Sequence, residues 1–157
     1  MEINIGLEKE GREEVAKVLN KYLANLHVLY TKLHNYHWNV EGKNFFQIHG
    51  KLEEIYDGTA VEIDEVAERI LTIGVRPAAS MKEYLELATL EEAESVGIQG
   101  KAIIETLLAD FTALIKDLRE GIEIAGKHGD EVSVDLMIGS LENYEKTSWM
   151  FRAFLTE

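Results

Sequence analysis

Apolar residues recur at steps of three and four along four long stretches of the chain, which is the spacing of amphipathic helices. The first stripe runs from Val15 to Leu33 and the second from Phe45 to Ile70. The third runs from Ile104 to Ala125 and the fourth from Met137 to Leu155. No run of alternating β-branched residues separates these stripes, so the pattern predicts four long helices and no strand.

Glycines mark where these helices should end. The first helix is expected to end by Gly42, and the second to stop before Gly74. Asn44 is a predicted N-cap of the second helix, because Gln47 follows it at the spacing of a capping box. Residues 126–129 contain two glycines and separate the third helix from the fourth.

The connection between the second and third helices is long and contains a short amphipathic segment, Met81 to Ala88. Four long helices with one long middle connection are typical of an all-α, ferritin-like four-helix bundle. The short segment is then an extra helix within that connection. A chain of 157 residues is expected to form a single domain, 1–157.

Composition narrows the classes of function. Lys and Arg number 16 against 29 Asp and Glu, which gives a formal net charge of −13 and argues against DNA binding by bulk charge. Cysteine is absent, which excludes disulfides and thiolate metal sites. The first residues lack a signal-peptide pattern and no apolar run has the length of a membrane span, so we expect a cytoplasmic protein that contacts no membrane.

The second predicted helix carries another stripe beside its apolar one. It consists of residues that share one face: His49, Glu53, Tyr56, Ala60, Asp64 and Glu68. A solvated polar face is the simplest interpretation of any single acid here. His37 lies twelve residues before His49, however, and two imidazoles with two carboxylates are suitable ligands for Fe(II), Zn(II) or Mn(II).

Helix geometry indicates that one chain cannot assemble such a site. At 1.5 Å per residue, His49 and Asp64 lie roughly 22 Å apart along a straight helix. His37 should lie close to His49 if the first two helices are antiparallel. Two chains whose second helices cross near Gly58 would join the histidines of one to the acids of the other, twice per two-fold dimer. An in-chain di-iron site is not expected, because no histidine has Glu three positions before it.

The stretches LHNYHWNVEGKNFFQIHGKLEEIYD and DEVAERILTIG resemble the Dps family (DNA-binding proteins from starved cells), also called mini-ferritins. This resemblance implies a hollow homo-dodecamer that oxidises Fe(II), typically with hydrogen peroxide, and stores the ferric product as mineral. It implies two iron positions per centre, held by His37, His49, Asp64 and Glu68, with the acids coming from the partner subunit. Glu53 falls near the second iron position, as a direct ligand, a water-mediated contact or a supporting group.

The resemblance extends to residues outside the centre. Trp38 matches an aromatic residue that takes up oxidising equivalents in the family, and packing at a helix end is the alternative. Asp130, Glu131 and Asp135 match acids that line negative pores at a three-fold axis, although N-capping explains Asp130 equally well. His27 and His34 match no family role and are interpreted as surface or interface residues.

The expected function is therefore iron storage and detoxification by a ferroxidase that protects the cell from oxidative damage. Zinc remains a possible substitute for iron, because the ligand types do not exclude it. The alternative is a nucleoid protein that protects DNA by direct or cation-bridged contact, although the chain has no basic tail. A helical assembly with a vestigial metal site is the third interpretation.

Overall fold

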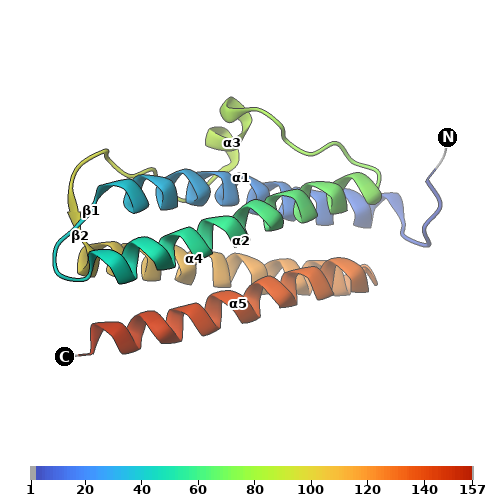
Figure 1. Ribbon diagram of the computed structural model, residues 1–157. Coiled ribbons are helices and arrows are strands. Elements are labelled where there is room, and N and C mark those ends of the chain that lie inside the picture. Colours follow the sequence, from blue (N-terminus) through green and yellow to red (C-terminus); the bar gives the residue numbers. More distant parts are fainter. Residues whose placement is uncertain (1–2, 157) are drawn as a thin grey trace.

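Four long helices pack side by side in a computed structural model, which describes residues 3–156 (Figure 1). They are α1 (Lys9–Asn39), α2 (Phe45–Thr72), α4 (Gly100–Lys127) and α5 (Glu131–Leu155). α1 runs antiparallel to α2, and α4 antiparallel to α5 (Figure 1). The predicted all-α bundle with one long crossover connection is therefore confirmed.

The long connection lies along the outer side of α1 and contains the predicted short helix, α3 (Met81–Leu87) (Figure 1). Ser80 caps α3, because its hydroxyl oxygen accepts a hydrogen bond from the Glu83 backbone amide. The Tyr84 ring stacks on the His27 ring of α1, with 3.8 Å between centroids. His27, interpreted from sequence as a surface or interface residue, therefore packs within the chain against α3.

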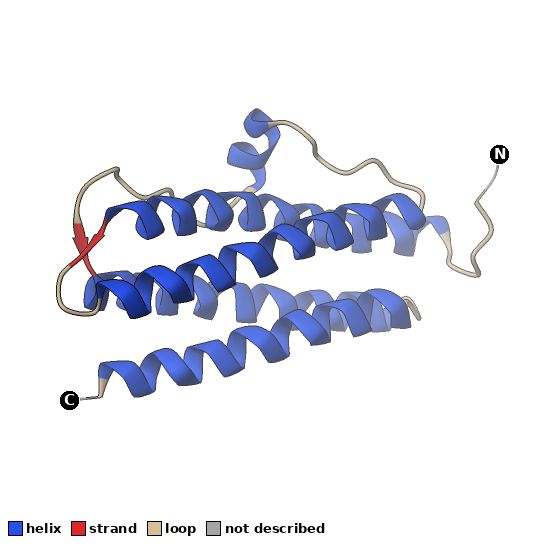
Figure 2. Cartoon of the chain, in the orientation of Figure 1, coloured by secondary structure: helices blue, strands red, loops and turns tan. Residues whose placement is uncertain are grey.

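Two short strands, β1 (Val40–Glu41) and β2 (Ile98–Gln99), pair in parallel at one end of the bundle (Figure 2). The prediction that the chain contains no strand was wrong, because two-residue strands are too short to show alternation. Asn44 does occupy the N-cap position of α2, but its side chain makes no capping hydrogen bond. The strand pair ties the turn between α1 and α2 to the start of α4.

The apolar stripes form one core along the length of the bundle. α1 contributes most to it, because it contacts α2, α3 and α4. Large side chains from α1, α2 and α4, such as Leu26, Leu52 and Phe111, are almost completely buried. Among residues 3–156, no helix combines the length and apolar character that a membrane span requires.

Candidate metal centre

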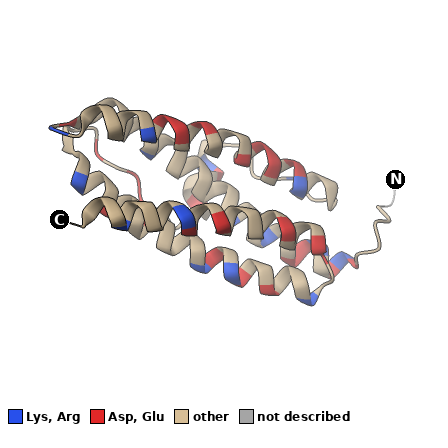
Figure 3. Cartoon of the chain, turned by 60° about the horizontal axis from the view of Figure 1, so that its bottom comes forward, with Lys and Arg blue, Asp and Glu red and all other residues tan. Residues whose placement is uncertain are grey.

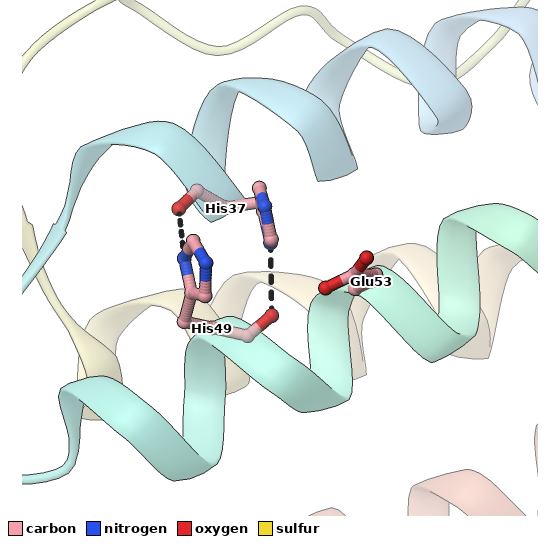
Figure 4. A group of neighbouring side chains, drawn as sticks. All are labelled: His37, His49 and Glu53. Carbon is pink, nitrogen blue, oxygen red and sulfur yellow. Dashed lines mark hydrogen bonds between the residues drawn. The ribbon is translucent and has the colours of Figure 1, made fainter.

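The last turn of α1 and the second turn of α2 bring His37 and His49 together (Figure 4). Their ring centroids lie 3.6 Å apart and the ring planes differ by 19°. Gly42 reverses the chain between the two helices with φ +101°, a conformation that other residues rarely adopt. The prediction that the two histidines lie close together is confirmed.

Each histidine ring is held by the backbone of the other. His37 Nδ1 donates to the carbonyl oxygen of His49 at 2.9 Å, and His49 Nδ1 donates to that of His37 at 2.8 Å. A carbonyl oxygen only accepts, so both Nδ1 atoms carry hydrogen. The His37 carbonyl belongs to the last turn of α1 and has no partner within its helix. Both Nε2 atoms are consequently the ones that can bind a metal.

Glu53 lies beside the histidine pair, one turn further along α2 (Figure 4). His37, His49 and Glu53 each offer a ligand atom, and these atoms all lie within 4.8 Å of one another. The carboxylate is exposed, and no residue of 3–156 forms a hydrogen bond or ion pair with it. Nitrogen and carboxylate oxygen donors suit Fe(II), Mn(II) or Zn(II), but three of them leave a metal incompletely coordinated.

Asp64 and Glu68 lie further along the same unbroken helix and do not join this group. Fifteen residues separate Asp64 from His49, about 22 Å of helix. Both carboxylates are exposed and make no hydrogen bond or ion pair within the described part of the chain. Within that part, His37, His49 and Glu53 form the only group of three or more potential ligands. One chain thus carries two separated sets of donors on α2.

Two small residues, Gly58 and Ala60, lie on α2 between the two sets of donors. Ala60 lies on the same side as His49 and Asp64, by the helical repeat of 100° per residue. Gly58 lies on the opposite side and lines a groove between α2 and α5 together with Gly139 and Asn143. Ala60, rather than Gly58, is therefore the small residue on the histidine face, and a crossing of two chains near this level of α2 stays a prediction.

A half-buried carboxylate between α2 and α5 was not singled out by the sequence patterns. Glu62 of α2 accepts hydrogen bonds from Tyr22 at 2.5 Å, from Tyr144 at 3.1 Å and from Ser140. Burial raises the pKa of both tyrosines and keeps their hydroxyls protonated as donors. Three hydroxyl groups satisfy this carboxylate, which agrees with the lack of an in-chain di-iron motif.

A group of aromatic rings extends from the histidine pair, and sequence patterns alone did not reveal it. The Tyr56 ring meets the His37 ring edge-on, with centroids 5.3 Å apart. His34 stacks on Tyr56 at 3.9 Å and lies 5.4 Å from Trp38, whose side chain is 71% exposed. Tyr30, His34 and Trp38 recur at four-residue steps on α1, which is the signal that could have identified the group.

The predicted pore acids lie where α4 gives way to α5, and they differ in exposure. Asp130 is buried, caps α5 by accepting from the Ser133 amide, and pairs with Arg69 at 2.5 Å. Glu131 and Asp135 are exposed. Acidic side chains occur on all four long helices and outnumber basic ones (Figure 3). Of these three carboxylates, only those of Glu131 and Asp135 are exposed.

A family model described as the ferritin-like domain matches residues 16–157. "DNA protection during starvation protein 2" of Bacillus anthracis is 46% identical over 92% of this chain and 99% of its own. "General stress protein 20U" of Bacillus subtilis is 41% identical over 91% of this chain and 98% of its own.

The fold is also found among solved structures of Dps proteins. The Dps crystal structure from Vibrio cholerae, described as a member of a superfamily of ferritin-like diiron-carboxylate proteins, is similar with a TM-score of 0.94. It is 39% identical and the match covers 99% of this chain and 98% of that one. The chain therefore belongs to the ferritin-like domain family and, within it, to the Dps proteins.

Proposed function

We propose that the protein is a ferroxidase and iron store whose metal centres each form between two subunits of a hollow dodecamer. The single observation that carries this proposal is the histidine pair with both Nε2 atoms available, on a helix that bears two unpartnered acids about 22 Å away. A two-fold axis across α2 would place the acids Asp64 and Glu68 of one subunit beside His37 and His49 of the other. Each dimer then has two complete centres.

Fe(II) is the substrate of these centres, and hydrogen peroxide is the oxidant we propose. Carboxylates and imidazoles bind Fe(II) without retaining Fe(III) too firmly. Two irons in one centre give peroxide its two electrons together, so the one-electron step that releases hydroxyl radical is avoided. Glu53 lies close enough to the histidines to contact the second iron, directly or through water.

Cations would reach the interior through negative pores. Glu131 and Asp135 are the exposed acids of the segment that resembles the pore lining, while Asp130 caps α5. A net charge of −13 on every subunit would draw cations inward and favour nucleation of ferric mineral. Zinc is the metal that would compete most directly, because it accepts the same donors.

Protection of DNA is the second candidate, and it is favoured by the name "DNA protection during starvation protein" of relatives from Bacillus anthracis and Brevibacillus brevis. The charge of −13 opposes direct contact with phosphates, so such binding would depend on bridging cations. Gel retardation of plasmid DNA with and without Mg(II) tests this: retardation only with Mg(II) supports bridging, and none in either case removes this function.

The deciding experiment adds Fe(II) to the protein without oxygen, then limiting hydrogen peroxide, and follows ferric absorbance. A parallel sample receives air instead. We expect fast oxidation at about two irons per peroxide, because peroxide takes two electrons and each Fe(II) supplies one, and we expect slow oxidation in air. No acceleration over free iron would overturn the ferroxidase, and fast oxidation in air alone would overturn the peroxide preference.

Variants of α2 connect this activity to the proposed ligands. Asp64→Asn should slow oxidation by peroxide while the assembled shell keeps its size. Glu65→Gln removes a neighbouring exposed carboxylate that lies outside the proposed centre and should leave the rate unchanged. A normal rate in Asp64→Asn would exclude Asp64 from the centre.

A further inference from the structure

A small polar hollow between α2 and α5 lies apart from the candidate metal centre. Its volume is about 220 Å³, and no proposed metal ligand lines it. On α5 it is lined by Asn143, Lys146 and Thr147, which share one face at steps of three and four residues. Lys51 and Glu62 line it from α2. These side chains have no part in the proposed ferroxidase, so the hollow needs a separate explanation.

Thr147 is buried, and its hydroxyl has no hydrogen-bond partner in the chain. The residue is 7% exposed, and no residue of 3–156 forms a hydrogen bond with its hydroxyl. Other threonines within the long helices, such as Thr59 and Thr106, donate to the carbonyl oxygen four residues earlier. The hydroxyl of a buried residue normally finds such a partner. The free hydroxyl of Thr147 in the wall of the hollow therefore points to a ligand that accepts its hydrogen.

Three further hydrogen-bond donors line the same hollow. Asn143 and Lys146 are exposed and have no hydrogen bond or ion pair within residues 3–156. The Lys51 ammonium has one partner, the Glu54 carboxylate at 2.7 Å, which leaves two of its three hydrogens. Amide, hydroxyl and ammonium donors around one hollow favour a ligand with several oxygen acceptors, and lysine ammonium groups commonly bind oxyanions.

Two carboxylates in the wall restrict which oxyanion fits. Glu54 and Glu62 balance the charge of the two lysines, so a fully ionised anion such as sulfate gains no net attraction. Glu62 accepts three hydrogen bonds from hydroxyl groups, and a carboxylate has about four acceptor positions. The remaining position belongs to Oε2, which accepts only from Tyr144. Hydrogen phosphate has a P–OH group that can donate to this oxygen, whereas sulfate has none.

We propose that the hollow binds one inorganic phosphate ion per subunit, in a form that still carries a proton. The phosphate oxygens accept hydrogen bonds from Asn143, Lys146 and Thr147, and the P–OH group donates to Glu62. A volume of about 220 Å³ leaves little room for the sugar or base of a phosphate ester, which favours free phosphate. The site shares no residue with the proposed ferroxidase centre and does not depend on that function.

The test titrates the assembled, metal-free protein with inorganic phosphate, sulfate and glycerol 3-phosphate in separate calorimetric experiments near neutral pH. We expect saturable binding of one phosphate per subunit. Sulfate and the ester should bind at least about tenfold more weakly, because a site that hydrogen-bonds a hydroxyl group rejects an analogue without it. No saturable phosphate binding overturns the proposal. Equal binding of sulfate overturns the role of Glu62, and equal binding of the ester overturns the assignment to free phosphate.

Variants of α5 locate the site. Lys146→Gln should weaken phosphate binding about tenfold and Thr147→Val about threefold, because each removes a hydrogen-bond donor. Lys116→Gln and Thr112→Val are the matched controls on α4 and should bind phosphate like the wild type. Lys116 is an exposed lysine without an ion pair within residues 3–156, and the Thr112 hydroxyl donates to a carbonyl of its own helix. Unchanged affinity in both Lys146→Gln and Thr147→Val overturns the proposal.

Replacing Glu62 tests the selectivity. Glu62→Gln removes the negative charge and supplies an amide donor, so its affinity for sulfate should rise about tenfold. Circular dichroism checks that this variant folds, because Glu62 accepts three hydrogen bonds that link α2 to α1 and α5. Sulfate binding that stays as weak in the folded variant overturns the role of Glu62. If the variant does not fold, the comparison of phosphate with sulfate on the wild type decides the selectivity.

Discussion

Lys32 and Asp110 form an ion pair inside the bundle, where a lost partner is costly. The Lys32 ammonium lies 2.8 Å from the Asp110 carboxylate, and their side chains are 4% and 11% exposed. Burial raises the pKa of Asp110, against the lowering by its hydrogen bond and attraction to Lys32. The pair therefore links α1 to α4, and neither charge can be buried at low cost without the other.

Replacing Asp110 by Asn should destabilise the protein by about 3 kcal/mol, because it leaves the Lys32 ammonium buried without an opposite charge. The double replacement Lys32→Met with Asp110→Leu should restore most of the loss. Asp117→Asn is the control, because the Lys21–Asp117 pair is half-exposed. Loss of that pair should lower the stability by less than about 1 kcal/mol. Thermal melting measures all three, and an equal loss in both single variants would contradict the argument.

The carboxyl group of Glu14 should make the stability of the fold depend on pH. It lies on α1 beside the end of α4, where it contacts His128. Its hydrogen bond with His128 and the charge of Lys127 lower the pKa of Glu14, against a smaller opposing effect of burial. A carboxyl whose pKa is lower in the folded state than its ordinary 4.5 stabilises the fold above about pH 4.5. That contribution is lost as the pH falls through the lowered value.

The melting temperature of Glu14→Gln should therefore lie below that of the wild type near neutral pH and converge with it in acid. Glu120→Gln removes an exposed carboxylate inside α4 that has no ion pair among residues 3–156, and it should match the wild type throughout. Melting curves across the pH range measure the difference. A gap between Glu14→Gln and wild type that stays constant in acid would refute the linkage to this carboxyl.

For single residues, the sequence predicted which site residues lie close together but not how their side chains are held. His37 and His49 are twelve residues apart on two antiparallel helices joined by a short turn, which is enough to place them near each other. The reciprocal bonds from each Nδ1 to the other's carbonyl depend on side-chain rotamers and on the end of α1, which no spacing rule contains. The contact of Tyr56 with His34 joins residues 22 positions apart on two helices, so only the packing of α1 on α2 reveals it.

At the scale of elements, the long helices were predictable because each carries a continuous apolar stripe of helical period. α3 was predicted one residue too long, at Met81 to Ala88, because the serine cap fixes its start and nothing comparable marks its end. The parallel pair β1–β2 joins residues 58 positions apart and has no local signal. Gly58 is a similar case. The sequence shows a small residue at this position, but it does not show that this residue faces the groove between α2 and α5.

Replacing a glycine by alanine should change stability in opposite directions at two positions, one on α5 and one on α4. A Cβ at Gly139 of α5 meets nothing within 4 Å, so Gly139→Ala should raise stability by up to about 1 kcal/mol through helix propensity. A Cβ at Gly121 of α4 would lie 2.7 Å from both Met137 and Val18, so Gly121→Ala should lower stability. Thermal melting of the two variants measures this, and a destabilised Gly139→Ala would show that another subunit covers α5 there.

At the scale of the whole molecule, one chain lacks a place where all the proposed metal ligands meet. The histidines and the acids lie on one straight helix and cannot converge without a second copy. An isologous contact repeats every interaction twice, so a single crossing of α2 completes two centres. Net charge works against such contacts, because each subunit carries −13, and metal bound between the subunits would offset part of that repulsion.

Mixed shells test the two-chain centre directly. His49→Leu and Asp64→Asn should each abolish most peroxide-driven iron oxidation when assembled alone. Random co-assembly of the two variants should recover about a quarter of the wild-type rate, because that share of centres takes its histidines from one intact set and its acids from the other. Stopped-flow ferric absorbance on shells of verified composition measures the recovery.

Co-assembly of His49→Leu with His37→Leu is the matched control. Both histidines of a centre come from the same chain, so every centre in that mixture keeps one defective histidine and no activity should return. Recovery in this control would mean that the histidines themselves are shared between chains. Absence of recovery in the first mixture, with both variants folded and assembled, would mean that each centre is built within one chain, and α2 would then have to bend far from the straight helix in which it folds.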